Sequence, residues 1–182
     1  MSKAEFRTTS VIIRRRLVGA ALFWPAYSLA ESCGRATQRQ TEGPFFKPQS
    51  PERNRLVDGK PASLLVTGRV LGADCKPVAH ALLDFWHADE HGDYDNQGFR
   101  YRGHQFTDAD GGYRLETIMP AEYPGRARHI HVKVQRPGGR ILTTQLYFPN
   151  NPGNERDGLF SPELVMQMAT RGQGLFDFVV AG

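Results

Sequence analysis

The sequence has few cysteines and no long apolar runs. Outside its first thirty residues it also has no excess of basic over acidic residues. Cys33 and Cys75 are the two cysteines of its 182 residues. In an oxidising compartment one disulfide between them is the simplest pairing, and two unrelated free thiols are the alternative. No internal repeat or low-complexity segment is present, and the length is that of a single domain with a sizeable core.

The net positive charge of the sequence is confined to the start of the chain. The sequence holds 23 Lys and Arg against 19 Asp and Glu, and residues 1–30 contain five of the basic residues and one of the acidic residues. Residues 31–182 therefore carry 18 charges of each sign and are formally neutral. Because a neutral body offers no electrostatic footprint for nucleic acid, we expect no nucleic-acid partner.

Residues 1–30 have the pattern of an export signal. Three consecutive arginines end at Arg16 and precede a mostly apolar run, residues 17–30, with small residues at its cleavage positions. These fourteen residues are too few to span a bilayer comfortably. We therefore expect an exported protein, periplasmic or extracellular, without a membrane segment in its mature form. Consecutive arginines favour the twin-arginine route, and an ordinary secretory signal or a disordered basic tail are the alternatives.

The rest of the chain alternates short apolar strands with turn-rich loops. The pattern predicts an extended N-terminal arm over residues 31–63 and a β-sandwich domain over residues 64–182. One short helix is predicted over residues 162–170, and strands are predicted over residues 64–71, 78–86, 100–106, 113–118, 129–136, 140–148 and 175–180. Short strands at this spacing, with turn signals between them, predict an all-β fold, an antiparallel β-sandwich with long loops.

One stretch, Tyr123–His131, holds a phenol and two imidazoles. His129 and His131 alternate with Ile130 and Val132, so on a strand the two histidines project from the same face. Two ring nitrogens side by side on a strand can form half of a metal site. Taken alone, however, such a pair is more often two ordinary surface or core histidines.

Two tyrosines can supply the other half of this site. Tyr94 follows the end of an apolar strand, and the Pro-Gly turn after Tyr123 can fold that side chain back over the strand that begins at His129. Two phenolates and two neutral imidazoles form a hard, partly anionic ligand set that suits ferric iron. Iron held in this state is a Lewis acid, and a catechol would chelate it once its adjacent hydroxyls are deprotonated.

A rival metal site lies close to Tyr94. His87 and His91 are four residues apart with Asp89 and Glu90 between them, which is the spacing of a helical zinc site. The segment that follows is rich in glycine, aspartate and asparagine, and these residues disfavour a helix. The zinc site is therefore the weaker hypothesis.

The motifs together resemble the intradiol ring-cleavage dioxygenases, on the protocatechuate 3,4-dioxygenase side. The resemblance covers roughly residues 41–180. It is carried by Thr41-Glu42-Gly43-Pro44-Phe45, Asp84-Phe85-Trp86, Gly92-Asp93-Tyr94, Thr107-Asp108-Ala109-Asp110-Gly111, Tyr123-Pro124-Gly125-Arg126, His129-Ile130-His131 and Thr144-Gln145-Leu146-Tyr147-Phe148.

The resemblance implies a non-haem Fe(III) cofactor and assigns its ligands to Tyr94, Tyr123, His129 and His131. It further implies that Tyr123 leaves the iron when the catechol chelates, and that it accepts a substrate proton. Arg126 would stabilise negative charge that develops on the substrate.

For the substrate itself, the resemblance implies a small catechol and O2. Gln145 and Trp86 would contact the catechol ring together with Arg126. The ring would open between its two hydroxyl-bearing carbons to give a muconate-type dicarboxylic acid. Two departures concern the substrate: Phe46 stands where many relatives have tyrosine, and an export leader is unlike the cytoplasmic enzymes of aromatic catabolism. The oligomeric state is left open, and a homo-oligomer is compatible with the sequence.

The alternative function is that of an exported, prealbumin-like binding module without catalysis. Val66–Val70 and Thr107–Tyr113 resemble turns and strands of such sandwich domains. A module of this kind has no need of the tyrosine and histidine set, and these four residues therefore separate the two hypotheses.

Overall fold

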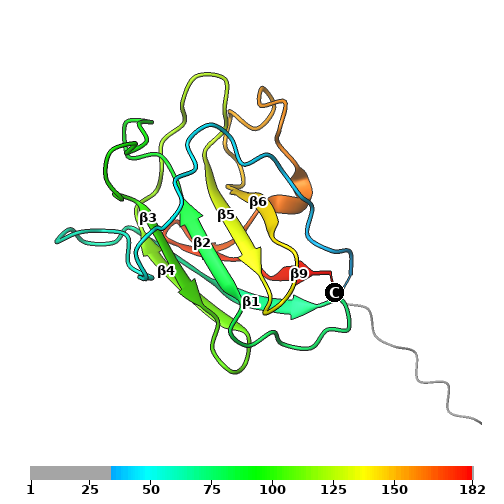
Figure 1. The fold of residues 1–182 in the computed structure, drawn as a ribbon. Coiled ribbons are helices and arrows are strands. Elements are labelled where there is room, and N and C mark those ends of the chain that lie inside the picture. Colours follow the sequence, from blue (N-terminus) through cyan, green and yellow to red (C-terminus); the bar gives the residue numbers. More distant parts are fainter. Residues whose placement is uncertain (1–33, 182) are drawn as a thin grey trace, which may run out of the picture.

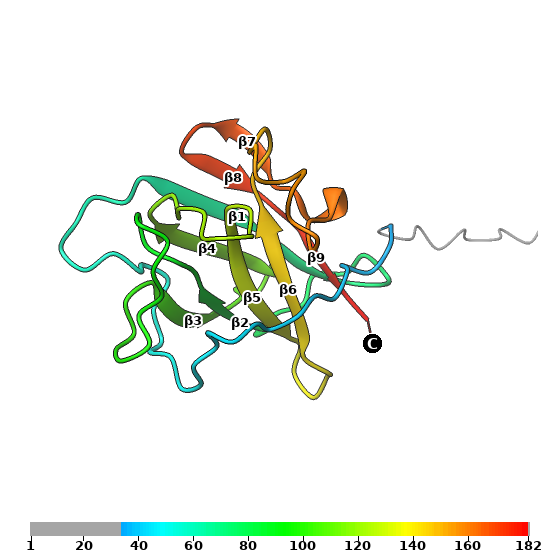
Figure 2. The same cartoon turned by 90° about the horizontal axis from the view of Figure 1, so that it is seen from above.

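Two β-sheets packed face to face carry all the named strands of the computed structural model, which describes residues 34–181 (Figures 1 and 2). The predicted export signal and Cys33 lie outside the described residues. Cys75 does not have a free thiol, and its pairing with Cys33 stays a prediction. Within residues 34–181 no helix is long and apolar enough to cross a membrane.

The first sheet has four antiparallel strands in the order β3-β2-β5-β6. They are β2 (Leu82–Trp86), β3 (Arg102–Phe106), β5 (His129–Gln135) and β6 (Leu142–Tyr147). The second sheet has the order β4-β1-β8-β7, with β9 also paired to β1. Its strands are β1 (Leu64–Gly72), β4 (Gly112–Thr117), β7 (Gln167–Thr170), β8 (Gln173–Leu175) and β9 (Phe178–Val180).

The core lies between the sheets and follows from the alternation of side chains along the strands. Ile130 and Val132 of β5 are fully buried against the second sheet, where Val66, Leu115 and Phe178 are also fully buried. The alternate residues of β5 point away from this core. The predicted all-β sandwich is confirmed, and its pairing is antiparallel except where β1 runs parallel to β8 and β9.

The predicted helix over residues 162–170 is wrong in its extent. Only Pro162–Leu164 forms one 3₁₀ turn, η1, and Gln167–Thr170 is strand β7. Val165 already has an extended backbone, and the Met166 N–H donates to the Tyr147 carbonyl at 2.9 Å. Pairing with the end of β6 therefore overrides a local composition that favours a helix.

Two predicted strands are shorter than expected. The strand over residues 78–86 is reduced to β2, because His80 has a left-handed φ of 54° just before it. The strand over residues 175–180 is divided into β8 and β9. Between them the Asp177 carboxylate accepts a hydrogen bond from the Arg69 N–H at 2.8 Å and so takes the place of a ladder carbonyl.

The N-terminal arm, defined here as residues 34–63, runs past the outer side of the first sheet (Figure 2, blue to cyan). Its backbone is tied to that sheet at several points: the Gln40 N–H donates to the Thr143 carbonyl at 2.8 Å, and the His104 N–H donates to Pro51 at 3.0 Å. The outer face of the first sheet is therefore covered rather than open to solvent.

Candidate metal centre

A row of four side chains crosses the outer face of the first sheet. Arg102 on β3 is directly opposite Trp86 on β2, which is opposite His131 on β5, which is opposite Gln145 on β6. Directly opposed residues on neighbouring strands share a face, and each of the four is at most 1% exposed. His129, opposite Tyr147, lies in the next row on the same face.

The two histidine rings point their Nε2 atoms at each other. These atoms are 3.0 Å apart, and the Tyr94 hydroxyl lies 3.4 Å from the His129 Nε2. The His129 Nδ1 is 2.6 Å from the Ala127 carbonyl. Because a carbonyl only accepts hydrogen bonds, the Nδ1 carries the proton of the neutral ring. The Nε2 therefore presents its lone pair toward the His131 Nε2 and the Tyr94 hydroxyl, and the place between these atoms is called the shared point below.

Burial keeps both imidazoles neutral. It lowers the pKa of His129 to about 4, with the nearby Arg126 acting in the same direction. The pKa of His131 lies well below its usual value, again chiefly through burial and then through His129. Burial, and next the neighbouring Tyr123, raise the pKa of the Tyr94 phenol. Neutral imidazole is the form that ligates metal. A buried phenol gives up its proton readily only when its oxygen binds a metal ion, because the cation stabilises the phenolate.

Tyr123 enters the same cluster from a tight turn. Pro124 and Gly125, which has a φ of 80°, form the centre of this turn, and the Arg126 N–H donates to the Tyr123 carbonyl at 2.9 Å. The Tyr123 ring centroid lies 5.8 Å from that of Tyr94 and 5.7 Å from that of His129. The structure thus brings together all four residues that the sequence assigns to the metal.

Arg126 connects this cluster to the predicted substrate contact on β6. One terminal nitrogen of its guanidinium donates to the Tyr123 hydroxyl at 3.2 Å, and the other donates to Gln145 Oε1 at 2.5 Å. Its Nε lies 3.0 Å from both carboxylate oxygens of Asp157. Arg126 is therefore held on two sides beside the phenol.

The arm closes the cluster from outside. Phe45 stacks on Tyr94 with a centroid distance of 4.4 Å, and Phe46 lies 4.9 Å from Trp86. Trp86 in turn stacks on His131 at 4.8 Å and an angle of 5°. Trp86 is assigned to the substrate by the sequence resemblance. In this structure its indole contacts the His131 ring directly and is covered by Phe46.

The two imidazole nitrogens, 3.0 Å apart, and the Tyr94 oxygen, 3.4 Å from one of them, form with the Tyr123 ring beside them a donor set that fits ferric iron. The set has no thiolate, and its two oxygen donors are hard and anionic once deprotonated. The His131 Nδ1 is buried without a hydrogen-bond partner among residues 34–181, so the polar contact of this ring is the one that its Nε2 makes with His129. The donors and their protonation states thus suit a trivalent, oxygen-preferring metal.

Comparison with known proteins identifies the family. Residues 41–174 match a protein-family model described as a dioxygenase. The chain belongs to the intradiol ring-cleavage dioxygenase family. A solved dioxygenase domain, from a dioxygenase–carbohydrate-binding protein fusion of the cellulolytic bacterium Streptomyces sp. SirexAA-E, is 54% identical. It covers 81% of this chain and 99% of that one, with a TM-score of 0.77.

More distant members of the family match this chain over part of their length. The hydroxyquinol 1,2-dioxygenase of Rhizobium sp. MTP-10005 is 30% identical over 79% of this chain and 58% of its own. The 3-chlorocatechol 1,2-dioxygenase structure from Rhodococcus opacus 1CP is 28% identical over 80% and 72% of the two chains, with a TM-score of 0.72. The chain spans about half the length of curated relatives such as the hydroxyquinol 1,2-dioxygenase.

The rival zinc site is not formed among residues 34–181. The segment after β2 is not helical, and the fully buried His87 lies 2.7 Å from both the Ala88 carbonyl and the Thr117 hydroxyl through its two ring nitrogens. Residues 34–181 contain no group of three or more His, Cys, Asp and Glu placed to hold a metal ion. His87 is a core residue, and its burial lowers its pKa to about 4.

Four further residues shape the candidate metal centre without having been assigned a role from the sequence: Phe45, Arg102, Tyr147 and Asp157. Phe45 and Tyr147 lie within motifs that carry the family resemblance, so a signal for them was present. The Tyr147 hydroxyl donates to Gln145 Oε1 at 3.1 Å. Arg102 acts mainly through backbone carbonyls, and Asp157 acts through the Arg126 side chain and through backbone N–H groups, and no residue spacing reveals these contacts.

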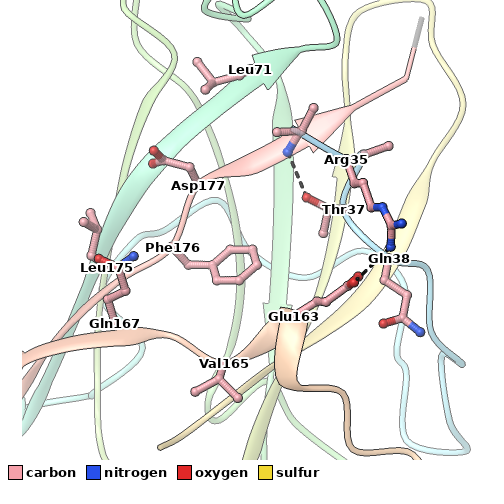
Figure 3. A pocket seen from close by; sticks show the side chains of 12 residues that line it. Arg35, Thr37, Gln38, Leu71, Glu163, Val165, Gln167, Leu175, Phe176 and Asp177 are labelled. Carbon is pink, nitrogen blue, oxygen red and sulfur yellow. Dashed lines mark hydrogen bonds and ion pairs between the residues drawn. The ribbon is translucent and has the colours of Figure 1, made fainter. Parts of the chain in front are cut away.

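Two cavities differ in their relation to this site. One of about 290 Å³ is lined by Tyr123 and Arg126 together with Glu122 and Arg156. A larger one, of about 550 Å³, lies against the second sheet between the start of the arm, η1 and the β8–β9 segment (Figure 3). Figure 3 shows the Phe176 ring facing this cavity. The larger cavity is lined by none of the four candidate metal ligands.

Proposed function

We propose that this chain is a non-haem Fe(III) intradiol dioxygenase. It cleaves a catechol-type ring between the two hydroxyl-bearing carbons with O2 and yields a muconate-type dicarboxylic acid. The observation that carries the proposal is the convergence of two neutral imidazole nitrogens, 3.0 Å apart, with the Tyr94 oxygen 3.4 Å from one of them. Tyr123 completes the set beside Arg126.

Each side chain has a role that follows from its place. Tyr94, His129 and His131 hold the metal, which when bound supplies the Lewis acidity that favours the deprotonated catechol. Tyr123 accepts a substrate proton at its phenol oxygen, where the Arg126 guanidinium already donates a hydrogen bond. The same fixed cation stabilises negative charge on the substrate oxygen. Gln145 accepts a hydrogen bond from Arg126 and so orients the guanidinium and, through it, the Tyr123 hydroxyl.

The substrate class is a single aromatic ring with adjacent hydroxyls. Relatives of this chain are named for catechol, hydroxyquinol, chlorocatechol and protocatechuate, and these four compounds are the panel to test. We also propose that the protein is exported, on the strength of its first thirty residues, and that it acts in the periplasm or outside the cell.

The experiment is a metal analysis combined with spectroscopy and turnover. Purified protein should contain one iron per chain and should be red-brown, because ferric tyrosinate absorbs visible light by charge transfer. Tyr123→Phe and His129→Ala should alter or abolish this band, whereas Tyr101→Phe, a phenol outside the site, should leave it unchanged. Oxygen uptake and product mass should then be followed together on the four catechols.

A colourless protein without stoichiometric iron would favour the exported binding module instead. Iron with a charge-transfer band that neither Tyr123→Phe nor His129→Ala changes would refute the ligand assignment while leaving the family intact.

A further inference from the structure

We propose that Asp157 is a positioning residue that couples the orientation of Arg126 to that of the metal-binding His129. The inference rests on the proposed function, because it assigns Asp157 a task toward the same metal centre. Asp157 lies in the loop after β6, 30 residues from Ala127 and 31 from Arg126 in the sequence.

The Asp157 carboxylate is buried and fully engaged. Its side chain is 1% exposed, and both of its oxygens lie 3.0 Å from the Nε of Arg126, whose side chain is 13% exposed. The same carboxylate accepts the backbone N–H of Ala127 at 2.9 Å and that of Leu159 at 2.9 Å. A buried carboxylate with these partners keeps its position, because moving it would leave charge and donors unpaired.

The first connection runs from Asp157 to the substrate side of the site. Because the Nε is fixed by the carboxylate, the two terminal nitrogens of Arg126 point at the Tyr123 hydroxyl and at Gln145 Oε1. The planar guanidinium has one fork geometry, so fixing one edge fixes the direction of the other. Asp157 thus sets where the positive charge of Arg126 lies relative to the phenol.

The second connection runs from Asp157 to the metal. Ala127 is fully buried, its N–H is held by Asp157, and its carbonyl lies 2.6 Å from the Nδ1 of His129. The hydrogen bond at one ring nitrogen of a ligating histidine sets the tautomer and the direction of the other. Through this one residue Asp157 also holds the His129 Nε2 toward the shared point.

The loop itself provides a rigid mount for Asp157. The Asp157 N–H donates to the Gly153 carbonyl at 3.0 Å, and the Phe160 N–H donates to the Asp157 carbonyl at 2.9 Å. The carboxylate is therefore fixed from its own backbone as well as through its partners. A single side chain outside both the motif at Tyr123 and the strand of the histidines orders the two together.

The two connections can be separated by measuring metal affinity apart from turnover. Ga(III), a hard trivalent ion without redox chemistry, is titrated into metal-free, full-length protein against a competing chelator. Turnover of catechol by the iron-loaded protein gives kcat and KM. The variants are Asp157→Asn and Arg126→Lys, and Asp108→Asn is the matched control. Asp108 accepts backbone N–H groups of its own turn, at 3.0 and 2.7 Å, away from the site.

We expect Asp157→Asn to weaken Ga(III) binding and to lower kcat/KM, each by roughly 10- to 100-fold, the range seen when partners of metal ligands are removed. Arg126→Lys keeps a cation beside Asp157 but loses the fork. It should lower kcat while changing Ga(III) affinity by less than about threefold. Asp108→Asn should change neither quantity by more than about twofold.

Ga(III) affinity of Asp157→Asn equal to that of the wild type would overturn the inference alone. So would an equal loss of affinity in Asp108→Asn, because the effect would then be general destabilisation. Wild-type protein that binds neither Ga(III) nor Fe(III) would overturn the proposed function and this inference together.

Discussion

Replacing Arg102 by methionine should loosen the N-terminal arm from the metal centre. Arg102 is 1% exposed, yet no carboxylate lies within ion-pair distance of it among residues 34–181. Its guanidinium instead donates to the Phe45 carbonyl at 2.6 Å and to the Asp95 carbonyl at 2.9 Å. The Phe45 carbonyl belongs to the arm, and the Asp95 carbonyl belongs to the loop that carries Tyr94.

The expected loss of stability is set by these two carbonyls. Methionine fills much of the same space but donates nothing, and each carbonyl left unpaired in a buried place costs about 1–3 kcal/mol. Removing a buried cation that has no anionic partner recovers part of this cost. The net loss should be about 2–4 kcal/mol, which for a chain of this length lowers the thermal midpoint by roughly 5–15 °C.

The assay is thermal unfolding of the metal-free protein together with hydrogen exchange over residues 41–50. Arg100→Met is the control, because that side chain is 52% exposed and makes one ion pair with Asp89 at 3.0 Å. Loss of such a pair should cost less than about 1 kcal/mol. If Arg102→Met changed stability by no more than Arg100→Met and left exchange of the arm unaltered, the role assigned to Arg102 would be wrong.

Two further predictions concern buried histidines and a close backbone approach. Burial lowers the pKa of His87 and of His129 to about 4 from an ordinary value of 6.5, so between these values the unfolded chain binds more protons than the folded one. Metal-free protein should therefore lose stability as the pH falls from 6.5 to 4, by roughly 1.4 kcal/mol per unit for each histidine, and melts that stay flat over this window would contradict it. A Cβ at Gly68 would lie 1.8 Å from the Phe176 carbonyl oxygen. Gly68→Ala should cost about 3 kcal/mol or more in urea unfolding, against about 1 for Gly138→Ala, which has open space but a φ of 68°, and equal losses would refute this reasoning.

Strand β5 is the element that the sequence predicts best. Alternation with a period of two is a strong local signal, and it assigned Ile130 and Val132 to one face and His129 and His131 to the other. The structure buries the first pair between the sheets and places the second pair in the candidate metal centre. Here local pattern and tertiary packing agree, so each supports the other.

The segment after residue 161 was predicted less well because its conformation is decided from outside. Pro162 and Glu163 are typical of a helix start, and the chain does begin a 3₁₀ turn there. The Met166 N–H then pairs with the Tyr147 carbonyl. The local composition of this segment contains no information about the Tyr147 carbonyl at the end of β6, with which the segment pairs.

The candidate site shows the same division. The four candidate metal ligands have their functional groups in their side chains and lie in recognisable sequence motifs. They are Tyr94, Tyr123, His129 and His131. Arg102 acts through the Phe45 carbonyl, and Asp157 acts in part through the Ala127 N–H, and these are backbone groups that nearly every residue possesses. Nothing in their identity distinguishes them from the many other charged residues of a neutral body. Only the distances in the folded chain assign them a role.

The two faces of β5 serve different ends, and this explains why the metal centre needs the arm. The inner face stabilises the sandwich by apolar burial and would do so in a module without any activity. The outer face carries imidazoles that ligate only when neutral, and their neutrality follows from burial. A sheet has just one other sheet to pack against here, so burial of the outer face has to come from segments that are not strands. Phe45 over Tyr94 and Phe46 over Trp86 provide it. The arm is thus part of the candidate metal centre: its phenylalanines cover the rings of that centre, and its Leu56 and Val57 also belong to the main hydrophobic core.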